Sequence, residues 1–109
     1  MSWRKKQSED EFFKRAKVDN YRSRASYKLL EIQQKFALIT CKSTIVDLGC
    51  APGGWLQVAR KLTEGEVYGI DLQDILPIPG THFAQMDFFD DNALDAFLPA
   101  KVEVILSDG

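Results

Sequence analysis

A glycine-rich loop that begins with a carboxylate carries the strongest chemical signal in this sequence. Residues 46–55 read VDLGCAPGGW, after a β-branched run and before a helical pattern. Gly49 lets the chain turn sharply, and Gly53 and Gly54 let the backbone approach a ligand without an intervening Cβ. The spacing G-x-x-x-G-G differs from the G-x-G-x-x-G that seats a pyrophosphate in dinucleotide enzymes. Asp47 would repel a phosphate there, but it suits the ammonium and sulfonium groups of a ligand such as S-adenosylmethionine.

Two further acids stand where strands are expected to end. Asp71 follows Asp47 by 24 residues, near the spacing at which an acid accepts hydrogen bonds from ribose hydroxyls. Asp87 closes the next apolar run, where its carboxylate can accept from an adenine amino group while Phe88 packs against the base. Each residue alone would be an ordinary strand-end acid or core phenylalanine. Together, behind one glycine loop, they indicate a nucleoside cofactor.

The elements that must position these residues follow from hydrophobic periodicity. Short apolar runs predict strands over 44–48, 66–71, 82–87 and 102–106, and helical patterns predict helices over 55–62 and 92–98. A capping box of Ser8 and Glu11 opens a helix through about Lys17. A second helix begins near Ser23, with an apolar stripe of Ala25, Leu29, Ile32 and Phe36. Alternating strands and helices predict an α/β fold with a parallel sheet, in which ligands bind beyond the carboxyl ends of the strands.

Charge and composition separate a basic head from an acidic body. The 109 residues suit one small domain, with 45% hydrophobic and 28% charged residues. Residues 1–28, the basic head, hold nine Lys and Arg against four acids, which gives a net charge of +5. The remaining residues, the acidic body, carry a net charge of −7. This split indicates a polyanionic partner for the head, although a solvated charged helix would show the same composition.

The cysteine and histidine content argues against a disulfide framework and a zinc site. Cys41 and Cys50 are the two cysteines and His82 is the one histidine. We expect Cys50 to be a packing residue. The sequence has no signal-peptide core and no apolar run of membrane-spanning length. These features predict a cytoplasmic protein with reduced thiols, no metal and no membrane partner.

Three motifs resemble the FtsJ/RrmJ family of ribose 2′-O-methyltransferases. They are RSRASYKL at 22–29, DLGCAPGGW at 47–55 and ILSD at 105–108. The likeness covers roughly residues 12–108, and it is greatest to bacterial members that act on 23S ribosomal RNA. It implies a Rossmann-like S-adenosylmethionine-dependent methyltransferase fold. Residues 1–42 would be a basic helical N-terminal segment and residues 43–109 the first half of the methyltransferase domain, with four parallel strands.

The resemblance also implies a catalytic tetrad of Lys, Asp, Lys and Glu. Lys28 matches the first lysine and Asp108 the aspartate, whereas the second lysine, which deprotonates the ribose hydroxyl, and the glutamate would follow residue 109. We therefore expect a fragment of a longer protein that is inactive by itself. Motifs and resemblance together predict these cofactor-binding residues: Asp47, Gly49, Pro52, Gly53, Gly54, Trp55, Asp71, Asp87, Phe88 and Asp108.

The chemistry of ribose methylation gives roles to Lys28 and to the basic head. The cofactor is already activated, so the protein must position the hydroxyl and manage one proton. A lysine serves as base only if burial or a neighbouring cation lowers its pKa, and we assign Lys28 an electrostatic, orienting role. Basic side chains would hold RNA phosphates while a tyrosine stacks on a base. The residues expected to contact RNA are Lys14, Arg15, Lys17, Arg22, Arg24 and Tyr27.

Other functions fit parts of the same sequence. The chain could be a non-catalytic cofactor- or RNA-binding module, because half of the tetrad is missing. A nicotinamide dehydrogenase is disfavoured by the glycine spacing and by Asp47. A transfer-RNA or messenger-RNA cap ribose methyltransferase would share the motifs. The substrate favoured by the resemblance is a uridine of 23S ribosomal RNA in the large ribosomal subunit, and the oligomeric state is left open.

Overall fold

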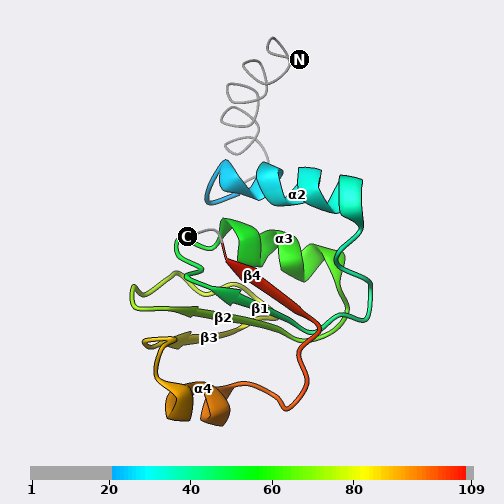
Figure 1. Cartoon of the computed structure of the whole chain (residues 1–109). Helices are drawn as coiled ribbons and strands as arrows, with labels where there is room; N and C mark the ends of the chain where they lie inside the picture. The colour runs from blue at the N-terminus through cyan, green and yellow to red at the C-terminus, as the bar shows by residue number, and fades with distance from the viewer. Residues whose placement is uncertain (1–20, 108–109) are drawn as a thin grey trace.

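A computed structural model of the chain describes residues 21–107, which form one parallel sheet with helices packed against it (Figure 1). The elements, in chain order, are α2 (Ala25–Phe36), β1 (Ile45–Leu48), α3 (Gly54–Leu62), β2 (Val67–Asp71), β3 (His82–Gln85), α4 (Asp91–Phe97) and β4 (Val104–Ser107). The helix expected over 8–17 lies outside the described residues, as do Lys14, Arg15, Lys17 and Asp108. The α/β fold expected from the sequence is confirmed.

The strands are ordered β3-β2-β1-β4, and every neighbouring pair is parallel. From β1 the chain moves outward through β2 and β3, and then returns to the other side of β1 as β4. The order therefore reverses beside β1, and in such sheets ligands bind at this point, beyond the carboxyl ends of the strands. The pairing of Leu48 with Ile70 brings the loops after β1 and β2 to the same edge.

The core lies between the sheet and α3, with α2 stacked on α3 (Figure 1). Leu56, Val58 and Ala59 of α3 are completely buried against β1 and β2. Both faces of β1 are covered, because Ile45 and Val46 are at most 1% exposed. A central parallel strand buried on both sides explains the continuous apolar run in the sequence.

The apolar stripe expected along α2 is correct at Leu29 and wrong at Phe36, which is 67% exposed. The buried residues of α2 are Ser26, Tyr27 and Leu29, so the helix packs through its N-terminal half. Its C-terminal end is free to face solvent. Ala37 then adopts a left-handed conformation, and its N–H donates to the Gln33 carbonyl at 2.8 Å, which ends the helix.

Two expected strand boundaries shift by two residues. β3 ends at Gln85 rather than at residue 87, so Asp87 lies in the following turn and its carbonyl accepts from Asp90 N–H. β4 begins at Val104 rather than at residue 102. The N–H groups of Glu103 and Val104 both donate to the carbonyl of Thr44, the residue just before β1. The regular pairing of β4 with β1 therefore begins only at Val104.

The loop between β2 and β3 is fastened to α3 by an arginine. Nη1 of Arg60 donates to the Gly80 carbonyl at 2.7 Å. Its Nη2 donates to the carbonyls of Thr63 and Gly65 at 2.7 and 2.8 Å. One guanidinium thus satisfies carbonyls that follow α3 and also anchors the far end of the β2–β3 loop.

Candidate functional site

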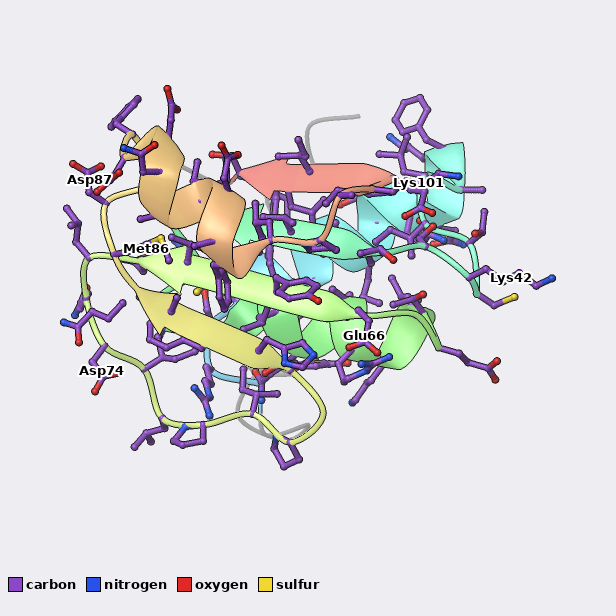
Figure 2. All side chains as sticks on the ribbon, turned by 90° about the horizontal axis from the view of Figure 1, so that it is seen from below. Lys42, Glu66, Asp74, Met86, Asp87 and Lys101 are labelled. Atoms are coloured by element: carbon purple, nitrogen blue, oxygen red, sulfur yellow. The ribbon has the colours of Figure 1, made fainter. Side chains whose placement is uncertain are left out.

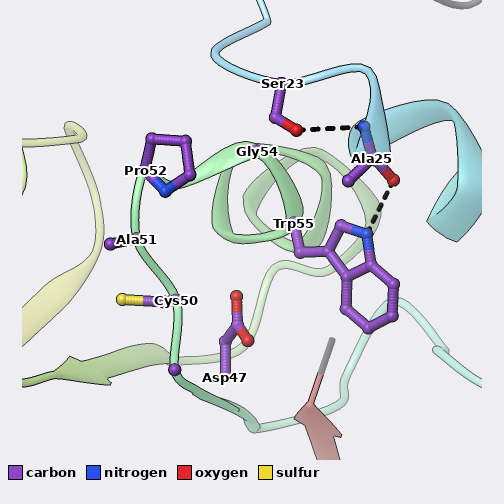
Figure 3. Close-up of a pocket in the computed structure, with 9 residues that line it drawn as sticks. Ser23, Ala25, Asp47, Cys50, Ala51, Pro52, Gly54 and Trp55 are labelled. Carbon is purple, nitrogen blue, oxygen red and sulfur yellow. Dashed lines mark hydrogen bonds between the residues drawn. The ribbon is translucent and has the colours of Figure 1, made fainter. Parts of the chain in front are cut away.

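A small pocket, partly open to solvent, lies where the glycine loop after β1 meets the first turn of α2 (Figure 3). Its lining residues are Ser23, Ala25, Asp47, Gly49, Cys50, Ala51, Pro52, Gly54 and Trp55. The loop turns at Gly49 and Gly53, whose φ angles of 73° and 116° favour glycine. The N–H groups of Gly49 and Cys50 both donate to the Ile70 carbonyl, which fixes the loop on β2.

The first turn of α2 lies close to the start of α3. A Cβ on Gly54 would stand 2.6 Å from Ser26 Oγ, so only a glycine allows this approach. The indole Nε1 of Trp55 donates to the Ala25 carbonyl at 2.6 Å (Figure 3). These contacts fix Lys28, three residues beyond Ala25 on the same helix, with its side chain exposed. Trp55 thus lines the pocket and also fastens α2.

Asp47 places a carboxylate at the floor of the pocket. The residue is 1% exposed, and Figure 3 shows the side chain directed into the space beside Trp55. A buried charge interacts more strongly with a neighbouring charge than it would in water. An ionised carboxylate at this position would attract a cationic group and repel a phosphate.

Asp71 joins the loops after β1 and β2. Its Oδ2 accepts from Ala51 N–H at 2.9 Å, and its Oδ1 accepts from Gln73 N–H at 2.8 Å. Each carboxylate oxygen keeps a second acceptor position, so ribose hydroxyls can still bind. The sequence predicted a ligand contact at Asp71, and the structure adds a role in holding the loop.

The segment that follows β3 places a carboxylate and two aromatic rings at the end of the sheet where the strands terminate. Figure 2 shows Asp87, Met86 and Asp74 together at one edge of the sheet, opposite Lys42 and Lys101. Asp87 is exposed, and its Oδ1 accepts from Phe89 N–H at 2.9 Å. The rings of Phe88 and Phe89 lie 4.8 Å apart. Phe89 is 81% exposed, so this pair presents an aromatic face to solvent beside Asp87.

Two of the residues expected to contact RNA, Arg22 and Tyr27, make their contacts within the protein instead. The guanidinium of Arg22 donates to the carbonyls of Pro52, Leu76 and Pro77. Tyr27 is 6% exposed and packs edge-on against Tyr21, with ring centroids 5.4 Å apart. A buried ring offers no face for base stacking. Arg24 is exposed and can reach a partner.

Cys50 lies in the loop with its thiol held in the protonated form. The residue is 4% exposed. Burial raises the pKa of Cys50 to about 12, and the neighbouring charges of Asp47 and Asp71 act in the same direction. A thiol with a raised pKa is a weak nucleophile, in agreement with the packing role expected from the sequence.

The raised pKa of Cys50 predicts a loss of stability at high pH. The unfolded thiol ionises from pH 9.0, whereas the folded thiol ionises near pH 12. The stabilisation is therefore complete below pH 9 and is lost as pH rises toward 12, at up to about 1.4 kcal/mol per pH unit. Urea unfolding of Cys50→Ala should show a shallower decline over this range than the unsubstituted chain. Cys41→Ala, at the exposed cysteine, should keep the original slope, and equal slopes for both variants would contradict this account.

Two features are absent from the described residues, 21–107. No group of His, Cys, Asp or Glu side chains among them could hold a metal ion. No helix in this part of the chain combines the length and the apolar character needed to cross a membrane.

A parallel sheet with a glycine loop after its first strand, and with a ligand pocket beyond the carboxyl ends of the strands, is the arrangement of nucleotide-binding α/β proteins. Residues 21–109 match the family of FtsJ-like methyltransferases, and the chain belongs to this family. It is 42% identical over 119 residues to the ribosomal RNA large subunit methyltransferase E of Ruegeria pomeroyi, covering 97% of this chain and 51% of that protein. The protein of the same name from Erythrobacter litoralis is 46% identical, with 97% and 50% covered.

A solved structure supports the same family. A ribosomal RNA methyltransferase from Plasmodium falciparum superposes with a TM-score of 0.71 at 35% identity, covering 82% of this chain and 56% of that one. The chain spans about half the length of the curated relatives that it matches.

Proposed function

We propose that this chain forms the cofactor-binding half of an RNA 2′-O-methyltransferase that uses S-adenosylmethionine. The favoured substrate is the ribose of a uridine in 23S ribosomal RNA of the large subunit. The observation that carries the proposal is the loop of residues 47–55, folded around a pocket whose floor is the buried carboxylate of Asp47. Family membership and the names of the relatives support it.

Each portion of this cofactor has a chemically suitable partner among the described residues. The charge of Asp47 suits the ammonium and sulfonium groups, and the free acceptor positions of Asp71 suit the ribose hydroxyls. Asp87 and Phe88 would receive the adenine, and Gly53, Gly54 and Trp55 would shape the backbone and wall around the methionine portion, with Gly49 and Pro52 in the same loop. Asp108, assigned by resemblance, lies outside the described residues. When bound, the cofactor supplies a methyl group that is already activated by its positive sulfur.

The chain's own contribution to methyl transfer is positioning and charge. The acids at the strand ends orient the cofactor, which leaves the acceptor ribose to approach from the side of α2. Lys28 projects from α2 with an exposed side chain. There it would place a positive charge near the ribose and favour the developing oxyanion. The base that removes the hydroxyl proton is the second lysine of the family's tetrad.

RNA contacts are proposed for Arg24 and, outside the described residues, for Lys14, Arg15 and Lys17. We expect Arg24→Ala to weaken RNA binding at every sequence and to lower the slope of log K against log salt by about one, since one phosphate contact is lost. Fluorescence anisotropy over a salt series measures this slope. Lys42→Ala removes an exposed lysine at the opposite edge of the sheet from Asp87 (Figure 2) and should leave the slope unchanged. An equal effect of both variants would show that RNA binding depends on the net charge of the chain and not on a contact made by Arg24.

Methyl transfer is tested with two polypeptides. One is this chain, and the other is this chain joined to the second half of the Ruegeria pomeroyi relative, where the resemblance implies the second lysine and the glutamate of the tetrad. We expect both to bind S-adenosylmethionine and only the joined protein to transfer a labelled methyl group to large-subunit ribosomal RNA. A 2′-O-methyl group blocks alkaline cleavage at its own nucleotide, which maps the position.

The alternatives are outcomes of the same experiment. Cofactor binding without transfer by the joined protein would favour a non-catalytic cofactor- or RNA-binding module. Transfer to transfer RNA or to capped messenger RNA, and not to ribosomal RNA, would favour another branch of the superfamily. The cytoplasm is the proposed location, since ribosomal RNA is the proposed substrate and both cysteines are free.

A further inference from the structure

The basic residue nearest to the glycine loop is bound to backbone carbonyls. Nη1 of Arg22 donates to the carbonyls of Pro52 and Leu76, and Nη2 donates to that of Pro77 at 3.0 Å. The backbone N–H of Arg22 donates to Oε1 of Gln57 on α3 at 2.8 Å. Arg22 therefore fastens the segment before α2 to α3, to the loop after β1 and to the loop after β2.

The guanidinium of Arg22 lies against the part of the glycine loop that has no side chain. A Cβ on Gly53 would stand 3.2 Å from Nη1 of Arg22 and 3.0 Å from Cδ1 of Ile78. The absence of that Cβ lets the loop after β1 rest on both the arginine and the β2–β3 loop. Asp71 ties the same two segments from the sheet side, through Ala51 N–H.

The contacts use the fork geometry that distinguishes arginine from lysine. A guanidinium has five N–H donors in one plane, so it can serve three carbonyls at once, whereas a single ammonium cannot reproduce that arrangement. Three of the five N–H donors serve carbonyls, so an RNA phosphate could use this guanidinium in full only by displacing them and releasing both loops. Arg22 thus acts as a clamp, by which we mean that its hydrogen bonds hold the loops after β1 and β2 together, although the residue lies within the basic residues 1–28.

We propose that Arg22 is a positioning residue, which sets the distance between the loops after β1 and β2 and thereby holds the cofactor pocket in its binding shape. This inference rests on the proposed function, because the pocket in question is the one proposed for S-adenosylmethionine. Arg22 itself touches neither the cofactor nor the RNA. Its effect is transmitted through Pro52 and Gly53 on one side and through residues 76–78 on the other.

The test combines cofactor titration with hydrogen exchange on the full chain. Calorimetry with S-adenosylmethionine should show binding weakened about tenfold or more in Arg22→Ala, and an intermediate loss in Arg22→Lys, which keeps the charge but not the fork. Lys35→Ala, at the exposed end of α2, should bind as the unsubstituted chain does. Amides of the β2–β3 loop should exchange faster in Arg22→Ala, while those of β1 keep their protection.

RNA binding separates a clamp from an RNA contact. Arg22→Ala should leave the salt slope of RNA binding unchanged, because the residue makes no phosphate contact, whereas a slope lowered by about one would overturn the proposal. Cofactor affinity in Arg22→Ala and Arg22→Lys equal to that of the unsubstituted chain would overturn the proposal, as would unchanged exchange in the loop. If Arg22→Ala does not fold, Arg22→Lys supplies the comparison of cofactor affinity and of loop exchange.

Failure of the proposed function gives a different result. A folded, unsubstituted chain that does not bind S-adenosylmethionine would contradict the cofactor assignment for this chain. The exchange data would then decide on the clamp alone, since faster exchange of the loop in Arg22→Lys supports it and unchanged exchange overturns it.

Discussion

Replacing Asp71 with alanine is expected to weaken S-adenosylmethionine binding by about 100-fold or more. The carboxylate has free acceptor positions for two ribose hydroxyls, and hydrogen bonds to a charged group contribute about 1.5–3 kcal/mol each, so losing two costs about 3 kcal/mol or more. The substitution also releases the Ala51 and Gln73 N–H groups that Asp71 now holds. Cofactor contact and loop position are lost together.

Calorimetric titration of the Asp71 variants checks this expectation. Asp74→Ala is the matched control, because Asp74 is an exposed acid of the same loop whose Oδ1 accepts only from its neighbour Ile75 among the described contacts. Asp71→Asn retains the shape and one acceptor oxygen and should lose less affinity than Asp71→Ala. Circular dichroism establishes that each variant is folded. Equal affinity of Asp71→Ala and the unsubstituted chain would remove Asp71 from the cofactor site.

Adding one methyl group at Gly54 is expected to separate α2 from α3. The new Cβ would stand 2.6 Å from Ser26 Oγ and 3.0 Å from Ser23 Cβ. Ser26 is completely buried and therefore has little room to move. Overpacking of this kind costs about 1–3 kcal/mol. Since Ser23 and Ala25 line the pocket, the displacement should also impair cofactor binding.

Gly49→Ala is the informative comparison for Gly54→Ala. Gly49 has a φ of 73°, but a Cβ there would meet no atom within 4 Å. Its substitution strains only the backbone, by about 1–2 kcal/mol. Urea unfolding should show that both variants lose stability, while titration should show the larger loss of cofactor affinity in Gly54→Ala. If Gly49→Ala impaired binding more, the contact between the two helices would not be what shapes the pocket.

The strands and the glycine loop could be predicted from the sequence because their signals are local. β-branched runs that end in glycine or aspartate identified β1 and β2 within a residue or two, and the acids at their ends follow from the strand assignment. The loop of residues 49–54 could be assigned because its own glycines determine its turns. The family's motifs lie in the same local segments, which is why the resemblance was visible.

The roles of Arg22 and Tyr27 could not be predicted, because they depend on contacts distant in the sequence. Arg22 meets Leu76 and Pro77, which are 54 and 55 positions away. Nothing near Arg22 distinguishes an arginine that binds carbonyls from one that binds phosphate. Tyr27 is buried because α2 packs through its first turns, and a helical period alone does not show which turns are covered.

The β2–β3 loop is held by its backbone. Arg22 and Arg60 bind the carbonyls of Leu76, Pro77 and Gly80, while the side chains of Leu72 and Leu76 are 69% and 76% exposed. Every residue has a backbone carbonyl, so these hydrogen bonds do not depend on which side chains the loop carries. Ile75 packs against the core, whereas Leu72, Gln73, Asp74 and Leu76 are exposed and can be exchanged for other residues without loss of the scaffold. These exposed positions follow β2 near the glycine loop, and new substrate preferences could evolve or be engineered on them.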